Sequence, residues 1–124
     1  MNSSSSYARN RSIGQFGEDI AARYLTDHGM TVLDRNWQCR FGEIDLVARE
    51  GSTLVVCEVK TRTTTAYGGP FEAVTDRKAT RLRRLAHAWL DAHPVNPEAV
   101  RIDVVSVVVP KRGAPQVERV TGVA

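Results

Sequence analysis

The stretch Gly42–Arg62, GEIDLVAREGSTLVVCEVKTR, contains two apolar runs separated by Gly51–Ser52. Both runs are rich in Val, Leu and Ile, which is typical of β-strands. Glycine in the first position of a two-residue connection favours a type II′ turn, so the stretch predicts a β-hairpin. Each strand nevertheless carries charged residues at positions where burial favours apolar ones.

Four of these charged residues are expected on one face of the hairpin. Counting back from the turn places Asp45 opposite Glu58, and Glu43 opposite Lys60. Like charges at directly opposed positions are destabilising, so the Asp45–Glu58 pair needs a positive group between the two carboxylates. Mg²⁺ takes one or two carboxylates and fills its shell with water and phosphate oxygens. A lysine beside it can hold the attacking water or neutralise charge on phosphorus, as metal-dependent phosphodiester hydrolysis requires.

A simpler interpretation of the same residues stays open. Glu43 and Lys60 can form an ordinary cross-strand ion pair, while Asp45 and Glu58 stand solvated on an open face of the sheet. Spacing alone does not decide between this interpretation and metal chemistry.

The rest of the chain predicts further elements in a regular order. Helical periodicity over residues 12–29 and 74–93 predicts two helices, and β-branched or alternating runs predict the strands 30–37, 39–50, 53–62, 100–109 and 115–123. A loop is expected at Gly68–Pro70. The order α-β-β-β-α-β-β predicts an α/β fold, a three-layer sandwich with a central mixed β-sheet flanked by helices. Asp103 interrupts a β-branched strand, and we expect it to pair with an arginine.

Composition is that of one ordinary globular domain. The chain has 124 residues, of which 42% are hydrophobic and 25% charged, with a net charge of +3. We expect a polar disordered tail over residues 1–11 and a single domain over 12–124. No apolar run approaches the roughly 18 residues that span a bilayer, so no membrane association is expected. Cys39 and Cys57 have neither metal-ligand spacing nor a disulfide framework, which favours a reducing cytoplasm.

The second predicted helix is rich in arginine. Arg77, Arg81 and Arg84 recur on one stripe, and Lys78 lies in line with the apolar face at the N-terminal end. Positive charge at a helix N-terminus is opposed by the macrodipole, unless phosphates bind there. The alternative is a solvated arginine face, with Lys78 extending out of the core. We take Lys78, Arg81 and Arg62, which follows Lys60 on the same face, as candidates for nucleic-acid contact.

These residues carry a family resemblance. GEIDLVA followed by VVCEVKTR resembles the D…ExK core of restriction-endonuclease-like nucleases. With GQFGEDIAARYL, NWQCRFGEIDLVA, GGPFEAVTDRK and RIDVV in order, nearly the whole chain beyond the tail resembles the YraN-type family of predicted endonucleases, which are related to archaeal Holliday junction resolvases. The resemblance implies a restriction-endonuclease-like fold and a Mg²⁺ or Mn²⁺ cofactor. It implies Asp45, Glu58 and Glu18 as metal ligands and Lys60 as the catalytic lysine. Glu43 fits the same block, and its expected pairing with Lys60 favours an orienting role behind the ligands.

The resemblance also implies a function and a partner. The expected activity is metal-dependent endonucleolytic hydrolysis of DNA, favoured over RNA, with branched or structured DNA expected by analogy to the resolvases. Such resolvases act as dimers, so a homodimer is expected by the same analogy. The alternative is a catalytically inactive module of nuclease ancestry that binds nucleic acid or another protein.

Overall fold

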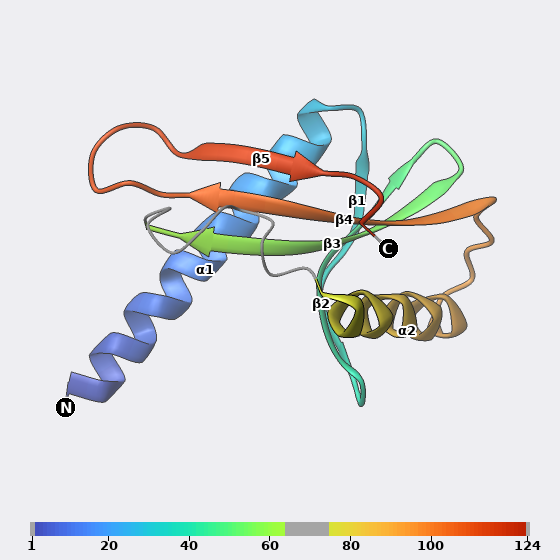
Figure 1. Cartoon of the computed structure of the whole chain (residues 1–124), viewed down its shortest axis with the longest axis horizontal. Coiled ribbons are helices and arrows are strands. Elements are labelled where there is room, and N and C mark those ends of the chain that lie inside the picture. The colour runs from blue at the N-terminus through green and yellow to red at the C-terminus, as the bar shows by residue number, and fades with distance from the viewer. Residues whose placement is uncertain (1, 64–74, 124) are drawn as a thin grey trace.

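The computed structural model describes residues 2–63 and 75–123, with side chains from residue 12 onward. Its elements follow the predicted order, and the α/β fold is confirmed (Figure 1). They are α1 (Asn2–Asp27), β1 (Thr31–Cys39), β2 (Gly42–Glu50), β3 (Thr53–Arg62), α2 (Asp76–Ala92), β4 (Ala99–Val108) and β5 (Gln116–Val120). The loop predicted at residues 68–70 lies outside the described residues.

The five strands form one mixed sheet in the order β1-β2-β3-β4-β5. Strands β3 and β4 are parallel, and the other neighbours are antiparallel. In Figure 1 the β1–β2 hairpin bends away from the direction of β3, β4 and β5. The sheet is therefore strongly twisted, and strands β2 and β3 separate toward one end.

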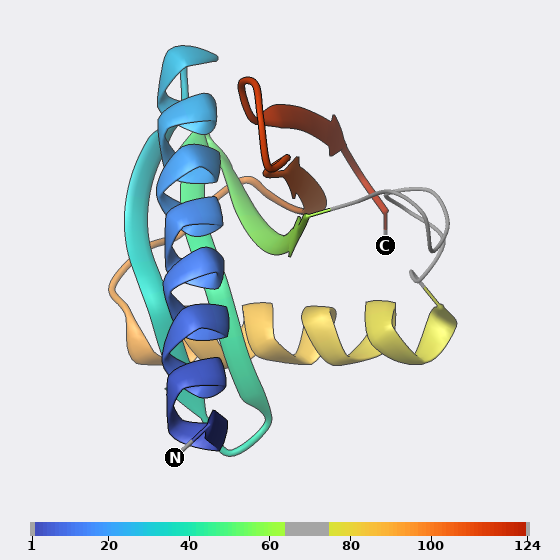
Figure 2. The same ribbon diagram turned by 90° about the vertical axis from the view of Figure 1, so that its left-hand side faces the viewer.

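The two helices cover opposite faces of the sheet and run crosswise to each other (Figure 2). On the α1 face, Ala21 and Leu25 pack with inward residues of β2, β3 and β4. On the α2 face, a second cluster joins four helix residues to the opposite side of the same strands; they are Leu82, Leu85, Ala86 and Trp89. Helices on both faces of a mixed sheet make the three layers of a restriction-endonuclease-like sandwich.

Helix α1 begins earlier than the sequence pattern predicts. It starts at Asn2 and not at Ser12, so the segment 2–11 continues the helix where a disordered tail was expected. That segment contains neither proline nor glycine, so nothing in its composition interrupts a helix that has formed downstream. Within the described residues, no helix is long and apolar enough to cross a membrane.

The aspartate in β4 has the predicted structural role. Asp103 is fully buried and accepts two hydrogen bonds from Arg101, at 2.9 and 3.0 Å. It also accepts bonds from Arg119 at 3.3 Å and from the Gly122 amide at 3.1 Å. A buried carboxylate with two arginines and a backbone donor is compensated, so Asp103 joins β5 to β4 and needs no ligand.

Helix α1 crosses the sheet at a glycine. Gly17 is buried, and a Cβ atom added there would lie 2.6 Å from Cγ2 of Thr61 in β3. Real Cβ atoms do not approach neighbours so closely, so only glycine allows this crossing distance. The contact holds α1 against the end of β3, immediately beside Glu18 and Lys60.

We predict that Gly17→Ala destabilises the protein by roughly 1–3 kcal/mol, because the new methyl group forces α1 away from Thr61. Gly14→Ala is the matched control in the same helix, since an added Cβ there meets nothing within 4 Å. That control should stabilise the protein by about 0.5–1 kcal/mol through helix propensity. Urea unfolding measures both changes, and equal effects of the two substitutions would contradict the close crossing.

Candidate active site

The predicted hairpin register holds over the first half of the ladder and then stops. Strands β2 and β3 pair from Glu50 opposite Thr53 to Leu46 opposite Cys57, as the sequence predicts. Beyond that point, the Oδ2 atom of Asp45 accepts a 2.8 Å hydrogen bond from the backbone N–H of Val59. A side chain thus takes a backbone donor at the end of the ladder, and the strands separate there.

The end of the ladder corrects two predictions. Asp45 was expected opposite Glu58 and Glu43 opposite Lys60, but the paired register stops before both levels. No ion pair joins Glu43 to Lys60 in the part of the chain that the structure describes. On the other edge of β2, Glu43 faces Gln38 of β1. Glu43 therefore belongs with the acids around Asp45.

Asp45 lies among acids in a partly buried position. Burial raises its pKa to about 6, the negative charges of Glu18, Glu58 and Glu43 add to the increase, and the Val59 hydrogen bond opposes it. The three acids come from α1, β3 and β2, so the fold brings together the residues that the resemblance implied. A carboxylate held among like charges is an unfavourable arrangement that a cation relieves.

Glu18 faces this group from α1. Burial raises its pKa, as does the charge of Glu43, whereas a hydrogen bond from Asn36 and the charge of Arg35 act in the opposite sense. Asn36 has a φ of 53°, the left-handed conformation that asparagine tolerates better than most residues. Arg35 also pairs with Asp19, one residue after Glu18. The β1 residues therefore hold this turn of α1 in place.

Glu58 is bound by the N-terminal part of α2. The Nζ atom of Lys78 lies 2.9 Å from Oε2 of Glu58, and Nη2 of Arg81 lies 3.6 Å from Oε1. The Thr75 hydroxyl caps the helix by accepting from the Lys78 amide. Lys78 thus extends past the core to the acids. Oε2 is buried and, despite the nearby ammonium, has no partner in hydrogen-bond geometry.

Lys60 completes the group from β3. Contact with the Lys78 side chain and burial lower the pKa of Lys60, the charge of Arg62 adds to this, and Glu58 opposes it. Lys60, Lys78 and Arg62 are therefore crowded positive groups beside crowded acids. Adjacent clusters of positive and negative charge, each unfavourable by itself, are typical of sites that bind charged substrates.

The donor set fits a divalent cation. Within the described residues, no three His, Cys, Asp or Glu side chains are gathered closely enough to enclose a metal by themselves. Mg²⁺ does not need such a cage, because it binds through one or two carboxylates and completes its octahedron with water and phosphate oxygens. Asp45 and Glu58 could supply these carboxylates, with Glu18 near Asp45, although Oε2 of Glu58 already lies 2.9 Å from the Lys78 ammonium.

Three features of the site were not found from sequence. They are the Asn36 contact to Glu18, the glycine crossing at Thr61, and an aromatic contact between Phe41 and Arg84 described below. The Asn36 contact had a weak local signal, because asparagine is favoured where φ is positive. The other two join residues far apart in the chain. Small residues at positions 14, 17 and 21 indicate that the helix lies close to a sheet, but they do not identify Thr61 as the contact, and the Phe41–Arg84 contact has no local signal.

Comparisons with known proteins give the chain a family. Residues 17–107 match the model of a family described as uncharacterised protein family UPF0102. A UPF0102 protein of Kineococcus radiotolerans is 61% identical over 113 residues, which cover 90% of this chain and 93% of that protein. One of Nocardioides is 51% identical over 123 residues, covering 99% of both chains. A third, of Streptomyces coelicolor, is 59% identical over 114 residues, covering 90% of this chain and 88% of that protein.

We predict that Asp45→Asn stabilises the metal-free protein, and increasingly so as the pH rises from about 4 to about 6. In that window the folded protein keeps a proton on Asp45 that the unfolded chain has already lost, so wild-type stability falls as the pH rises. Asparagine does not titrate and can still accept the Val59 hydrogen bond. The difference should reach at most about 3 kcal/mol above neutral pH and then level off.

Urea unfolding in EDTA across this pH range measures the difference. Asp91→Asn, at an exposed position late in α2, is the control and should show no such trend. A stability difference between wild type and Asp45→Asn that does not change with pH would contradict the raised pKa.

Proposed function

The chain belongs to the uncharacterised protein family UPF0102, the YraN-type family, and we propose that it is a metal-dependent endonuclease that hydrolyses phosphodiester bonds of DNA. The observation that carries the proposal is the position of Asp45. Its carboxylate is partly buried among Glu18, Glu43 and Glu58, at the point where β2 and β3 separate, and Lys60 stands beside Glu58.

In this proposal Asp45 and Glu58 hold Mg²⁺ or Mn²⁺, and Glu18 holds it or orients a water. The bound metal supplies Lewis acidity, which lowers the pKa of water and stabilises charge on the phosphorus centre. Glu43 orients the ligands from behind. Lys60 acts at the reacting phosphate, where its ammonium neutralises developing negative charge or positions the attacking water.

Positive groups around the acids bind the scissile strand. Lys78 and Arg81 now face Glu58, so a phosphate that enters between β3 and α2 would meet both side chains and take the place of the carboxylate as their partner. Arg62 follows on the strand that carries Lys60. Contacts of this kind position a strand without reading its sequence.

The proposal extends to substrate form, assembly and location. Branched or structured DNA, and a homodimer that cuts two strands, follow by analogy with the resolvases that the motifs resemble. Cys39 and Cys57 are both free, which fits a reducing cytoplasm.

A second candidate function is a nucleic-acid-binding or protein-interaction module that does not cut. The observation in its favour is that Glu58 already has two basic partners, Lys78 and Arg81. Such a module would bind nucleic acid equally well in EDTA, and Lys60→Ala would leave that binding unchanged.

The deciding experiment incubates the purified protein with labelled duplex, single-stranded, flap and four-way-junction DNA in Mg²⁺, Mn²⁺ or EDTA. We expect metal-dependent nicking that falls at least about a hundredfold in Asp45→Asn and Lys60→Ala, since each removes a group that acts in the transition state. Mn²⁺ should also raise the melting temperature of the wild type, but not that of Asp45→Asn, because binding to the folded state stabilises it.

Matched controls remove the same charges elsewhere. Asp91→Asn and Lys111→Ala change exposed residues distant in sequence from the acids, and both should cut like the wild type. Nicking of equal rate in the wild type and in Asp45→Asn would identify a contaminating nuclease and refute the proposal.

A further inference from the structure

We propose that Arg40, Phe41 and Arg84 form a phosphate clamp that holds the backbone of a nucleic-acid strand outside the acidic site. The inference rests on the proposed function for its class of partner, since it extends the same binding surface. It concerns three residues to which the resemblance assigns no role.

The clamp consists of two guanidinium groups on one aromatic ring. The guanidinium carbon of Arg40 lies 4.8 Å from the centre of the Phe41 ring, and that of Arg84 lies 5.5 Å from the same centre. Both distances are within the range of a cation–π interaction. Arg40 and Phe41 belong to the turn between β1 and β2, whereas Arg84 comes from α2, so the fold itself brings the two charges together.

Neither arginine is neutralised by an acid. Among the described residues, Arg40 and Arg84 make no ion pair, whereas Arg35 pairs with Asp19, and Arg101 and Arg119 pair with Asp103. Both unpaired side chains are exposed, and Phe41 is half-buried against the α2 core cluster. Two guanidinium groups that contact one ring and lack acidic partners favour the binding of an anion, and each can bind phosphate through two hydrogen bonds.

The clamp is continuous with the acidic site. Arg84 follows Arg81 by three residues on α2, so the two side chains are neighbours on one side of the helix. Arg81 in turn reaches Glu58 at 3.6 Å. The turn that carries Arg40 lies against the helix, because Phe41 packs on the core cluster that contains Leu85. A strand whose phosphate lies at the acids can therefore continue along Arg81 to the clamp.

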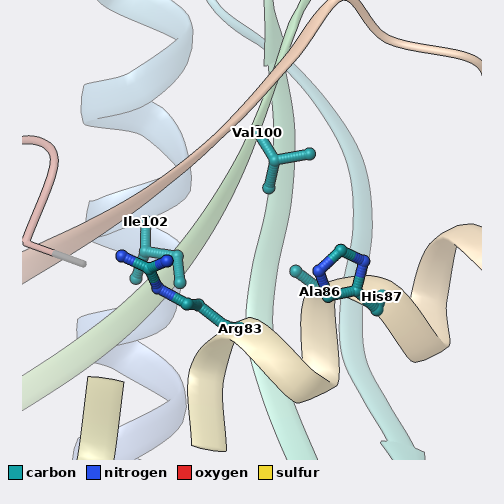
Figure 3. A pocket seen from close by; sticks show the side chains of 5 residues that line it. All are labelled: Arg83, Ala86, His87, Val100 and Ile102. Atoms are coloured by element: carbon teal, nitrogen blue, oxygen red, sulfur yellow. The ribbon is translucent and has the colours of Figure 1, made fainter. Parts of the chain in front are cut away.

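The other flank of α2 provides the control. There Arg83, Ala86 and His87 line a small pocket with Val100 and Ile102 of β4, and Figure 3 shows Arg83 extending toward Ile102. Arg83 is exposed and also lacks an acidic partner in the described part of the chain. It carries the same charge as Arg84 on the adjacent residue of the same helix, but away from the clamp.

The test measures binding of fluorescein-labelled single-stranded and duplex DNA by anisotropy, in EDTA and at several KCl concentrations. We expect Arg40→Gln and Arg84→Gln each to weaken binding roughly five- to tenfold. Each should also reduce the magnitude of the slope of log Kd against log salt concentration, by about 0.7 for single strands or about 0.9 for duplex. Arg83→Gln should bind like the wild type, and circular dichroism melting verifies that all variants are folded.

Phe41→Leu tests the role of the ring. It keeps both charges but loses the surface that positions them, so binding should weaken roughly threefold while the salt dependence stays that of the wild type. Equal losses in Arg83→Gln and Arg84→Gln, or no measurable DNA binding by the wild type, would overturn the clamp. Because these measurements need no cutting, a protein that fails to nick DNA but loses binding in the clamp variants refutes the nuclease proposal and supports the clamp.

Discussion

The hydrogen bond from the Val59 amide to the Asp45 carboxylate is the constraint on which the rest of the site depends. A ladder that ends inside a sheet leaves backbone donors without partners, which is costly unless another acceptor is available. Asp45 supplies that acceptor, so β2 and β3 can separate without an unsatisfied amide at Val59. Near this separation Glu18 of α1 lies close to Asp45, and the N-terminal part of α2 contacts Glu58. The interaction that opens the sheet is therefore made by a residue that we propose for catalysis.

Two aspartates in this sheet differ in whether neighbouring groups compensate their negative charge. Asp103 is fully buried but is compensated by Arg101, Arg119 and a backbone amide, so it acts as a structural link. Asp45 has one backbone donor and lies near further acids, and burial together with the charges of these acids raises its pKa to about 6. The first arrangement is complete in the protein alone. The second lowers the stability of the folded state, and a cation bound from solution would relieve the repulsion between the carboxylates.

Helix α2 connects the acids to the proposed partner. Its apolar stripe packs on the sheet, and the residues beside that stripe point to two different surfaces. On one side, Lys78 and Arg81 contact Glu58, and Arg84 continues the row to the β1–β2 turn. On the other side, Arg83 lies over an apolar pocket against β4. The arginines of α2 thus lie on two sides of the helix with different surroundings, and one of these sides is next to the acids.

The order of the elements, the register of the hairpin near its turn and the arginine partner of Asp103 could be predicted from the sequence, because these follow from local periodicity and charge. The sequence placed Asp45, Glu58 and Lys60 on neighbouring strands, but the predicted pairings of Asp45 with Glu58 and of Glu43 with Lys60 were wrong, because the ladder ends at Leu46 and Cys57. Only the tertiary structure decided where the ladder ends, since that depends on a side chain competing for a backbone donor while β3 follows its parallel partner β4. It also decided the contacts of Gly17 with Thr61 and of Phe41 with Arg84. Contacts of that kind arise when separate elements pack, and no short-range pattern encodes them.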